Sequence, residues 1–597
     1  MGYLPIEDHG VIGNLHTAAL VGTDGTIDWL CVPAFDSPSV FCSILDDEKG
    51  GHFSLHPTEY LHSQQLYLPD TNVLLTRFLA EDGMAETLDF MPISSASVER
   101  HRLVRNVRVI RGEMTFDVEC KPAFDYARQG HSVKVGKKGA VFSSSETCLG
   151  LSTDVSLKEG PGNGTRARFT LKEGETATFV LAKIEQGEEP LEVLKEKSFD
   201  ELLQDTIGYW RRWISKSTYQ GQWREAVHRS ALALKLMVYD PTGALVAAPT
   251  MGLPESIGGE RNWDYRYTWL RDAAFALYAL ISIGFDEEAG KFMHWLTSRC
   301  QEADGSLQPL YSLDGRSKIH EEELNHLSGY RGSSPVRVGN DAYGQLQLDV
   351  YGAVMDAAYL YNKWGAPLDY DLWHNMRRIM DWLSDNWQQP DEGMWEVRGG
   401  RQQFVSSKVM SWVALERAVR ISRQRGLPAG DGHWIRERDK IYEEIMQKGW
   451  NPDKKSFVQY YGSNALDASL LMMPLVKFVG PTDPRWISTL DRIQEELTYD
   501  TLVDRYNVED AASDGLSGAE GSFSLCSFWY VECLAKSGRV EEARLALEKM
   551  FSYANHLGLY AEEIGRSGEA LGNFPQAFTH LSLISAAIHL DRALGSS

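Results

Sequence analysis

Residues 577–588 read Ala-Phe-Thr-His-Leu-Ser-Leu-Ile-Ser-Ala-Ala-Ile, with apolar side chains at positions 577, 581, 584 and 588. Spacings of three and four place these side chains on one face of a helix. Residues 270–281, Leu-Arg-Asp-Ala-Ala-Phe-Ala-Leu-Tyr-Ala-Leu-Ile, show the same pattern. From about residue 220 onward the pattern returns roughly twelve times, so this whole region is predicted to be helical.

The connections between the expected helices alternate in length. The helices are predicted to begin near Gln222, Thr268, Asp286, Gly344, Tyr370, Lys408, Gly432, Asn464, Pro481, Glu520, Val540 and Pro575. Connections after odd-numbered helices span roughly 15 to 40 residues and those after even-numbered helices roughly 2 to 9, the short class being typical of helical hairpins. A ring of such hairpins carries its long loops at one end, where we expect the functional residues.

The first 200 residues are predicted to form an antiparallel β-sandwich. Asp24-Gly25 separates the strands 17–21 and 27–32, and Asp82-Gly83 separates the strands 73–80 and 85–91. Both dipeptides are strong hairpin signals. Further strands are expected at 103–110, 114–120, 132–135, 140–142, 167–171 and 177–182. The predicted organisation is a β-domain over residues 1–200, a helical linker over 201–221 and a helical domain over 222–597.

Composition indicates a large globular protein that avoids polyanions. The chain has 597 residues, and 83 acidic against 60 basic side chains give a formal charge of -23. That charge repels nucleic acid and anionic lipid, and it suits a neutral or cationic small ligand. The other interpretation is that the acidity serves solubility alone. The chain start shows no leader and no stretch is long enough to span a bilayer, so we expect a cytoplasmic protein without membrane contact. The sequence is compatible with a homo-oligomer as well as with a monomer.

Cysteine and histidine spacing gives no metal signature. The seven cysteines are scattered and odd in number, which indicates reduced, mostly buried thiols. His320 and His326 lie six residues apart, whereas a metalloprotease helix needs two histidines four apart. Nucleotide-binding fingerprints are also missing, and neither a metal nor a cofactor is predicted.

The first long loop ends in a dense run of aromatic and charged residues, from Arg261 to Asp272, and includes Trp263 and Trp269. Aromatic rings stack on the apolar faces of sugars, while guanidinium and carboxylate groups bind hydroxyls. Trp263, Trp269, Arg271 and Asp272 are therefore candidate sugar-binding residues. The other interpretation is that the aromatic residues belong to the core and that Arg271 and Asp272 form a surface pair.

Two further long loops carry candidate catalytic carboxylates. Residues 390–398 include Trp395 and Glu396, and an aromatic neighbour that excludes water raises the pKa of a carboxyl group. The last loop contains Glu562, for which the helix that follows offers no capping role. Glu396 as a general acid and Glu562 as a base would suit glycoside hydrolysis. For the loop of residues 390–398 taken alone, a solvated acidic turn is the more common explanation.

These motifs, in this order on successive loops, resemble glycoside hydrolase family 15, the glucoamylase and trehalase family. The resemblance spans nearly the whole chain, from Asp8-His9-Gly10 to Gly572-Asn573-Phe574-Pro575-Gln576. It implies an N-terminal β-sandwich followed by an (α/α)6 barrel.

The resemblance also implies roles for individual residues. Glu396 is expected to be the general acid and Glu562 the general base, while Arg271 and Asp272 bind hydroxyls of the terminal glucose. Further sugar-binding positions are expected at Arg505, Glu520, Trp263, Trp269 and Trp395.

The implied reaction inverts the configuration at the anomeric carbon. Its two carboxylates lie far enough apart for a water molecule to fit between the base and that carbon. Trp395 is expected to keep Glu396 protonated, and a wetter setting is expected to keep Glu562 ionised.

The favoured interpretation is an exo-acting α-glucosidase of the glucoamylase type that acts on small α-glucosides, and a trehalase is the nearest alternative. A glucoside phosphorylase or a non-catalytic glucan-binding protein are more distant alternatives.

Overall fold

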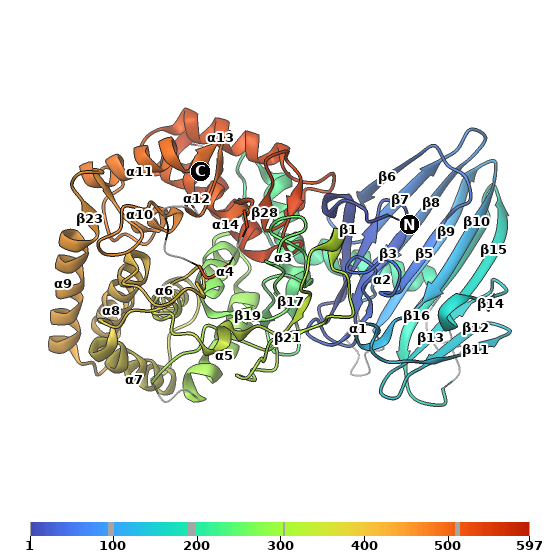
Figure 1. Cartoon of the computed structure of the whole chain (residues 1–597), viewed down its shortest axis with the longest axis horizontal. Coiled ribbons are helices and arrows are strands. Elements are labelled where there is room, and N and C mark those ends of the chain that lie inside the picture. The colour runs from blue at the N-terminus through green and yellow to red at the C-terminus, as the bar shows by residue number, and fades with distance from the viewer. Residues whose placement is uncertain are drawn as a thin grey trace.

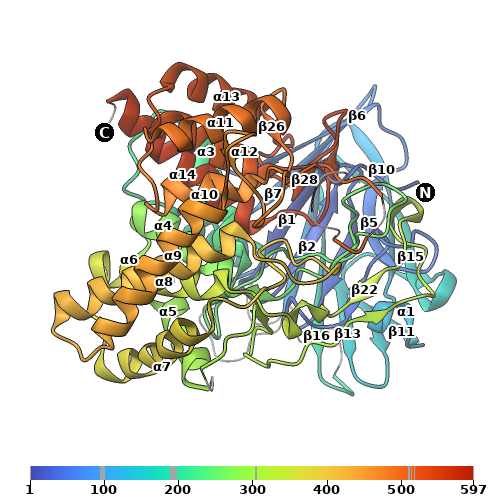
Figure 2. The same ribbon diagram turned by 60° about the vertical axis from the view of Figure 1, so that its left-hand side comes forward.

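The computed structural model describes residues 2–93, 101–188, 198–302, 305–507, 511, 514–516 and 518–595. A β-rich N-terminal region and a larger helical region lie side by side (Figures 1 and 2). This arrangement confirms the expected order of an antiparallel β-domain followed by a helical domain. Within the described residues, no helix has the length and apolar character needed to cross a membrane.

The N-terminal region contains two antiparallel sheets of eight strands each among the described residues. The first orders β1 (His9–Gly13), β2 (Ala18–Gly22), β3 (Thr26–Cys31), β5 (His52–Pro57), β10 (Glu113–Lys121), β15 (Thr165–Lys172) and β14 (Lys158–Glu159), with β4 (Ser39–Phe41) paired to β3. The second orders β11 (Ser132–Gly136), β12 (Gly139–Ser143), β13 (Cys148–Thr153), β16 (Thr176–Ile184), β9 (Arg102–Arg111), β8 (Met84–Phe90), β7 (Leu74–Leu79) and β6 (His62–Tyr67).

Both predicted hairpins are present. Gly25 adopts φ +81° between β2 and β3, and its N–H donates to Gly22 O at 2.9 Å. Between β7 and β8, Ala80 N–H donates to Gly83 O at 2.9 Å. Sequence analysis missed β1, β4, β5, β6, β13 and β14. β1 and β13 are buried at every position, and β6 is a polar strand at the edge of its sheet. None of these three strands shows the alternation of apolar and polar residues that reveals a half-buried strand.

The helical region contains the expected helices. They are α3 (Arg224–Met237), α4 (Leu270–Ser282), α5 (Asp286–Glu302), α6 (Asp349–Trp364), α7 (Tyr370–Asn386), α8 (Val405–Arg425), α9 (Asp431–Lys448), α10 (Met472–Leu475), α11 (Pro484–Glu496), α12 (Ser524–Lys536), α13 (Val540–Ser552) and α14 (Ala577–Leu594). The segment expected from Asn464 is only a 3-10 turn, η6 (Ala468–Leu471), followed by the short α10. Lys477 adopts a left-handed φ of +65°, which ends this segment.

Alternate helices pack in a closed series. α4 contacts α6, α6 contacts α8, α8 contacts α10, α10 contacts α12, α12 contacts α14, and α14 returns to α4. The intervening helices pack outside this series, as α5 does on α4 and α6, and α13 on α12 and α14. The long connections include short strands such as β21 (Glu322–Glu323) and β28 (Glu563–Ile564), which lie on the side facing the N-terminal sheets (Figure 1).

The N-terminal region is tied to the loop that precedes α4. Arg266 is fully buried, and its guanidinium donates to Ser37 O at 2.8 Å and to the Tyr126 hydroxyl at 2.8 Å, both in the β-region. The same guanidinium pairs with Asp264 at 2.7 Å. Trp29 of β3 also donates to Pro249 O at 2.8 Å. These contacts fix the run of residues 261–272 against the sheets.

The segment between the two regions includes α2 (Phe199–Ile214), in which Trp213 stacks on Phe285 at 4.0 Å between ring centroids. Residues 189–197 lie outside the described residues. The domain boundaries near residues 200 and 222 stay predictions. All seven cysteines are buried free thiols, as the sequence indicated.

Candidate active site

One pocket contains both predicted catalytic carboxylates. Its wall includes Glu396, Glu562, Arg271, Asp272 and Trp269. Arg271 and Asp272 lie in the first turn of α4, where a loop becomes a helix. The structure therefore brings together, in one pocket, side chains from three loops that are far apart in the sequence.

Glu396 is held in a strained turn with its carboxylate towards the pocket. It adopts φ +60°, which is uncommon for a residue other than glycine and is often found at functional sites. Its N–H donates to Gly393 O at 3.2 Å. Trp269 Nε1 donates to Glu396 Oε1 at 2.6 Å, and Arg271 Nη2 lies 3.5 Å from the same oxygen.

Trp395, the expected aromatic neighbour of Glu396, lines the same pocket as Glu396. Its Nε1 donates to Asp467 Oδ1 at 2.9 Å, and its ring packs against Phe523. The indole hydrogen bond to Glu396 comes from Trp269, on a distant loop.

Glu562 is more buried than expected. Only 1% of the residue is exposed, whereas 19% of the Glu396 side chain is exposed. Asn573 N–H donates to Glu562 Oε2 at 3.4 Å, and Glu562 Oε1 has no hydrogen-bond partner among the described residues. Burial, followed by the charge of Glu255, holds the pKa of Glu562 well above its usual range. The expected wetter setting for Glu562 is therefore wrong, because the chain that follows β28 folds back over it.

Arg271 is surrounded by carboxylates. It lies 3.6 Å from Asp272 Oδ1, 4.0 Å from Asp349 Oδ2 and 3.5 Å from Glu396 Oε1, and it donates to Met394 O at 2.5 Å. Burial raises the pKa of Asp272 to about 7 and that of Asp349 to about 6. Sequence analysis missed Asp349, because an acidic residue in the first turn of a helix is common without a functional role.

Arg505 lines the pocket, and Glu520 positions it. Arg505 Nε and Nη2 donate to the two oxygens of Glu520 at 3.0 and 2.5 Å. The guanidinium also lies 4.2 Å over the ring of Phe523. Glu520, which was expected to bind sugar, is not part of the described pocket wall and instead holds Arg505 in place.

A second pocket adjoins the first. Tyr265, Trp395, Glu396 and Arg505 line both pockets. Trp263, expected at the sugar, lines only the second pocket.

Polar and aromatic groups shape the second pocket. Trp263 Nε1 donates to Glu255 Oε1 at 3.0 Å, and the Arg398 guanidinium lies 4.3 Å over the Trp263 ring. Sequence analysis missed Tyr265, which lies inside the quoted run 261–272, and Glu255, for which the sequence holds no signal.

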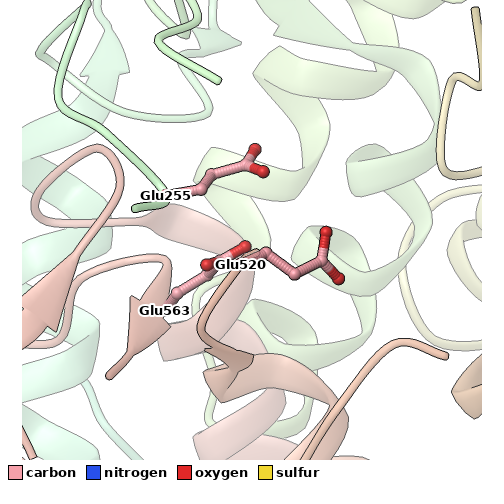
Figure 3. A group of neighbouring side chains, drawn as sticks. All are labelled: Glu255, Glu520 and Glu563. Carbon is pink, nitrogen blue, oxygen red and sulfur yellow. The ribbon is translucent and has the colours of Figure 1, made fainter. Parts of the chain in front are cut away.

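Three carboxylates lie beside Arg505. One oxygen from each of Glu255, Glu520 and Glu563 lies within 4.8 Å of the others, and the three side chains reach the same space from separate loops (Figure 3). Arg505 Nη2 lies between two of them, 2.5 Å from Glu520 Oε2 and 3.5 Å from Glu255 Oε2. The group is therefore organised around a guanidinium, and a metal ion in the same space would compete with that charge.

Known proteins resemble both parts of the chain. Residues 221–588 match the family model for glycosyl hydrolases family 15, and residues 2–189 match that of the trehalase-like N-terminal domain. A trehalase of Thermoplasma acidophilum is 41% identical over 579 residues, which cover 96% of this chain and 98% of that protein. A trehalase of Mycobacterium tuberculosis is 39% identical over 619 residues, covering 99% and 90%.

Among solved structures, a bacterial glucoamylase complexed with acarbose has the same fold. It aligns with a TM-score of 0.74 at 13% identity, covering 99% of this chain and 95% of that chain. From these matches, the chain belongs to glycoside hydrolase family 15 and is a glycoside hydrolase.

Proposed function

We propose that this glycoside hydrolase is an inverting α,α-trehalase. Relatives that are 41% and 39% identical over nearly their whole length are named trehalases. These relatives favour trehalase, the alternative of the sequence analysis, over the glucoamylase-type interpretation placed first there.

The observation that carries the proposal is the pair of adjoining pockets. Glu396 and Arg505 lie in the wall of both pockets. Trehalose consists of two glucose units joined through their anomeric carbons. An enzyme that cleaves it must bind one glucose unit on each side of the group that protonates the linking oxygen, and two adjoining pockets that share Glu396 support this assignment.

In the proposed reaction, Glu396 donates a proton to the linking oxygen and Glu562 accepts one from the attacking water. Arg271 and Asp272 bind hydroxyls of the glucose in the first pocket through charge-assisted hydrogen bonds. Arg505, which lines both pockets, contacts the substrate near the bond that breaks.

We also infer that the helical region is an (α/α)6 barrel. The support is the closed series of inner helices and the outer helices packed around it. We place the end of the β-domain near residue 200 and the start of the barrel near residue 222. The segment between them contains most of α2.

The anomeric form of the products tests the proposal. Inversion converts the cleaved glucosyl unit to β-glucose, while the leaving unit stays α-glucose, so proton NMR should show equal initial amounts of the two. Two α-glucose units would mean retention, and glucose 1-phosphate in the presence of phosphate would mean a phosphorylase. Faster release of glucose from maltose or isomaltose than from trehalose would contradict the trehalase assignment.

Variants of the two carboxylates test their roles. Glu396→Gln and Glu562→Gln should each lower kcat for trehalose by about 10² to 10⁴-fold, the usual contribution of a general acid or base. Glu548→Gln, an exposed position on α13, is the matched control and should keep normal kinetics. Near-normal turnover in Glu562→Gln would exclude it as the base.

A further inference from the structure

The second pocket contains a basic side chain that the proposed reaction does not use. Arg398 belongs to the described wall of this pocket and not to that of the first. It lies two residues after Glu396 on the same loop, and 32% of its side chain is exposed. Its backbone N–H donates to Asp514 O at 2.7 Å, which joins its loop to the one that follows α11. Arg398 therefore combines a fixed backbone with a side chain that a ligand can reach.

One carboxylate orients the Arg398 guanidinium. Nη1 donates to Glu321 Oε1 at 3.1 Å, and Nη2 donates to Glu321 Oε2 at 2.6 Å. A bidentate pair of this kind fixes the plane of the guanidinium as well as its position. Only 10% of the Glu321 side chain is exposed, and Arg337 Nε lies 3.2 Å from Glu321 Oε1. Glu321 is therefore itself held in place by a second guanidinium.

The ring of Trp263 supports the same guanidinium. Arg398 Cζ lies 4.3 Å from the centroid of this ring, and Arg337 Cζ lies 4.8 Å from it, both within the range of cation–π attraction. The ring is fixed in turn, because its Nε1 donates to Glu255 Oε1 at 3.0 Å. A ring face that carries a guanidinium cannot also stack on a sugar, so on that face Trp263 supports Arg398 instead of a glucose unit.

The Arg398 guanidinium keeps donors available for a ligand. A guanidinium has five N–H groups, and the bidentate pair with Glu321 uses two of them. The other three form no hydrogen bond within the part of the chain that the structure describes. Sugar hydroxyls accept charge-assisted hydrogen bonds from such groups. The second pocket thus presents an oriented set of donors that suits a neutral ligand rich in hydroxyls.

We propose that Arg398 binds hydroxyls of the leaving glucose unit in the second pocket, and that Glu321 is the positioning residue that orients Arg398. The proposal rests on the proposed function, because it needs one glucose unit in each pocket. Arg271 and Asp272 bind the glucose unit that is cleaved, in the first pocket. Arg398 therefore acts on a substrate only when its leaving group is a sugar.

Two substrates separate a contact with the leaving group from general damage to the site. Trehalose carries a leaving glucose, whereas α-glucosyl fluoride delivers the same glucosyl unit with a leaving group too small to reach Arg398. Arg398→Ala should lower kcat/KM for trehalose about 10 to 100-fold, the usual effect of removing a charged hydrogen-bond donor. The value for α-glucosyl fluoride should change by less than about threefold. Equal losses with both substrates, or an unchanged value for trehalose, would overturn the proposal.

Arg398→Lys repeats the test with a smaller change. Lysine keeps the charge but lacks the planar fork that pairs with Glu321. This variant should lose less kcat/KM for trehalose than Arg398→Ala and should again keep its activity on α-glucosyl fluoride. A loss on the fluoride as large as that on trehalose would show that Arg398 has only a structural role.

A double-mutant cycle tests whether Glu321 acts through Arg398. Glu321→Gln should lower kcat/KM for trehalose by less than Arg398→Ala does and should leave the fluoride unaffected. The double variant should be no worse on trehalose than Arg398→Ala alone, because the interaction that Glu321 supports is already lost. Losses that multiply in the double variant would refute the positioning role of Glu321.

Arg401→Ala is the matched control on the same loop. Arg401 pairs with Glu392 at 2.9 Å, its side chain is 45% exposed, and the described walls of the two pockets do not include it. This variant should leave both kcat/KM values unchanged. If the wild type cleaves maltose faster than trehalose, the trehalase assignment fails. Maltose also carries a leaving glucose, so the same comparison made with maltose then decides the role of Arg398 separately.

Discussion

At the scale of single residues, the indole of Trp269 holds the carboxylate of Glu396 in position through a hydrogen bond. Its Nε1 donates to Glu396 Oε1 at 2.6 Å. Trp269→Phe keeps an aromatic ring but removes this donor, and the loss of one such hydrogen bond should lower kcat about tenfold. Steady-state kinetics with trehalose measure the effect. In the control Trp434→Phe, the lost bond to Asp381 lies between α7 and α9, so Tm should fall while kcat is unchanged.

Asp272 predicts a pH dependence of stability. Burial raises its pKa to about 7 in the folded protein, against about 3.9 in an unfolded chain. The neutral form is therefore favoured by folding, and this contribution is present below pH about 4 and lost as pH rises through about 7. Calorimetry should show a smaller decrease of Tm between pH 4 and 7 in Asp272→Asn than in the wild type. Parallel curves for the two proteins would contradict the prediction.

At the scale of elements, the hairpin of β28 and β29 (Ala570–Leu571) places the proposed base. Gly572, which follows β29, adopts φ +73°, and a Cβ there would lie 2.5 Å from Glu562 Oε2. Gly572→Ala should displace Glu562 and lower kcat about 100-fold, since a small misplacement of a catalytic group can cost that much.

Gly568 in the turn of the same hairpin is the matched control for Gly572. It has φ +88°, but the nearest atom to an added Cβ belongs to Tyr553, at 3.7 Å. Gly568→Ala should therefore cost similar backbone strain without a loss of kcat. Equal kcat values for the two variants would show that strain, and not the position of Glu562, decides activity.

At the scale of the whole molecule, the N-terminal sheets support the active site through Arg266. Its guanidinium connects Ser37 and Tyr126 with Asp264, a few residues before Trp269 on the same loop. Arg266→Met leaves the buried Asp264 without its partner, which should lower the free energy of unfolding by about 3 to 5 kcal/mol and also reduce kcat. In Arg168→Met, an exposed pair with Asp117 is lost, and both Tm and kcat should change little.

Much of the fold could be predicted because its signals are local. Asp24-Gly25 and Asp82-Gly83 fix their turns within four residues, and the apolar spacing of residues 270–281 and 577–588 fixes α4 and α14. The strands β1 and β13 could not be found, because their burial depends on covering elements from elsewhere in the chain. The candidate site residues could be placed on loops, but not oriented.

The sequence by itself determined the order of the two domains, the family, and the loops that bear Glu396 and Glu562. Only the tertiary structure decided that Trp269, which is 127 residues from Glu396 in the chain, contacts its carboxylate. It also decided that Glu562 is the more buried of the two and that Glu255 and Glu563 stand behind it. The physical reason is that helix periodicity and turn chemistry act between near neighbours. Burial and charge pairing instead depend on atoms that meet only when distant loops pack together.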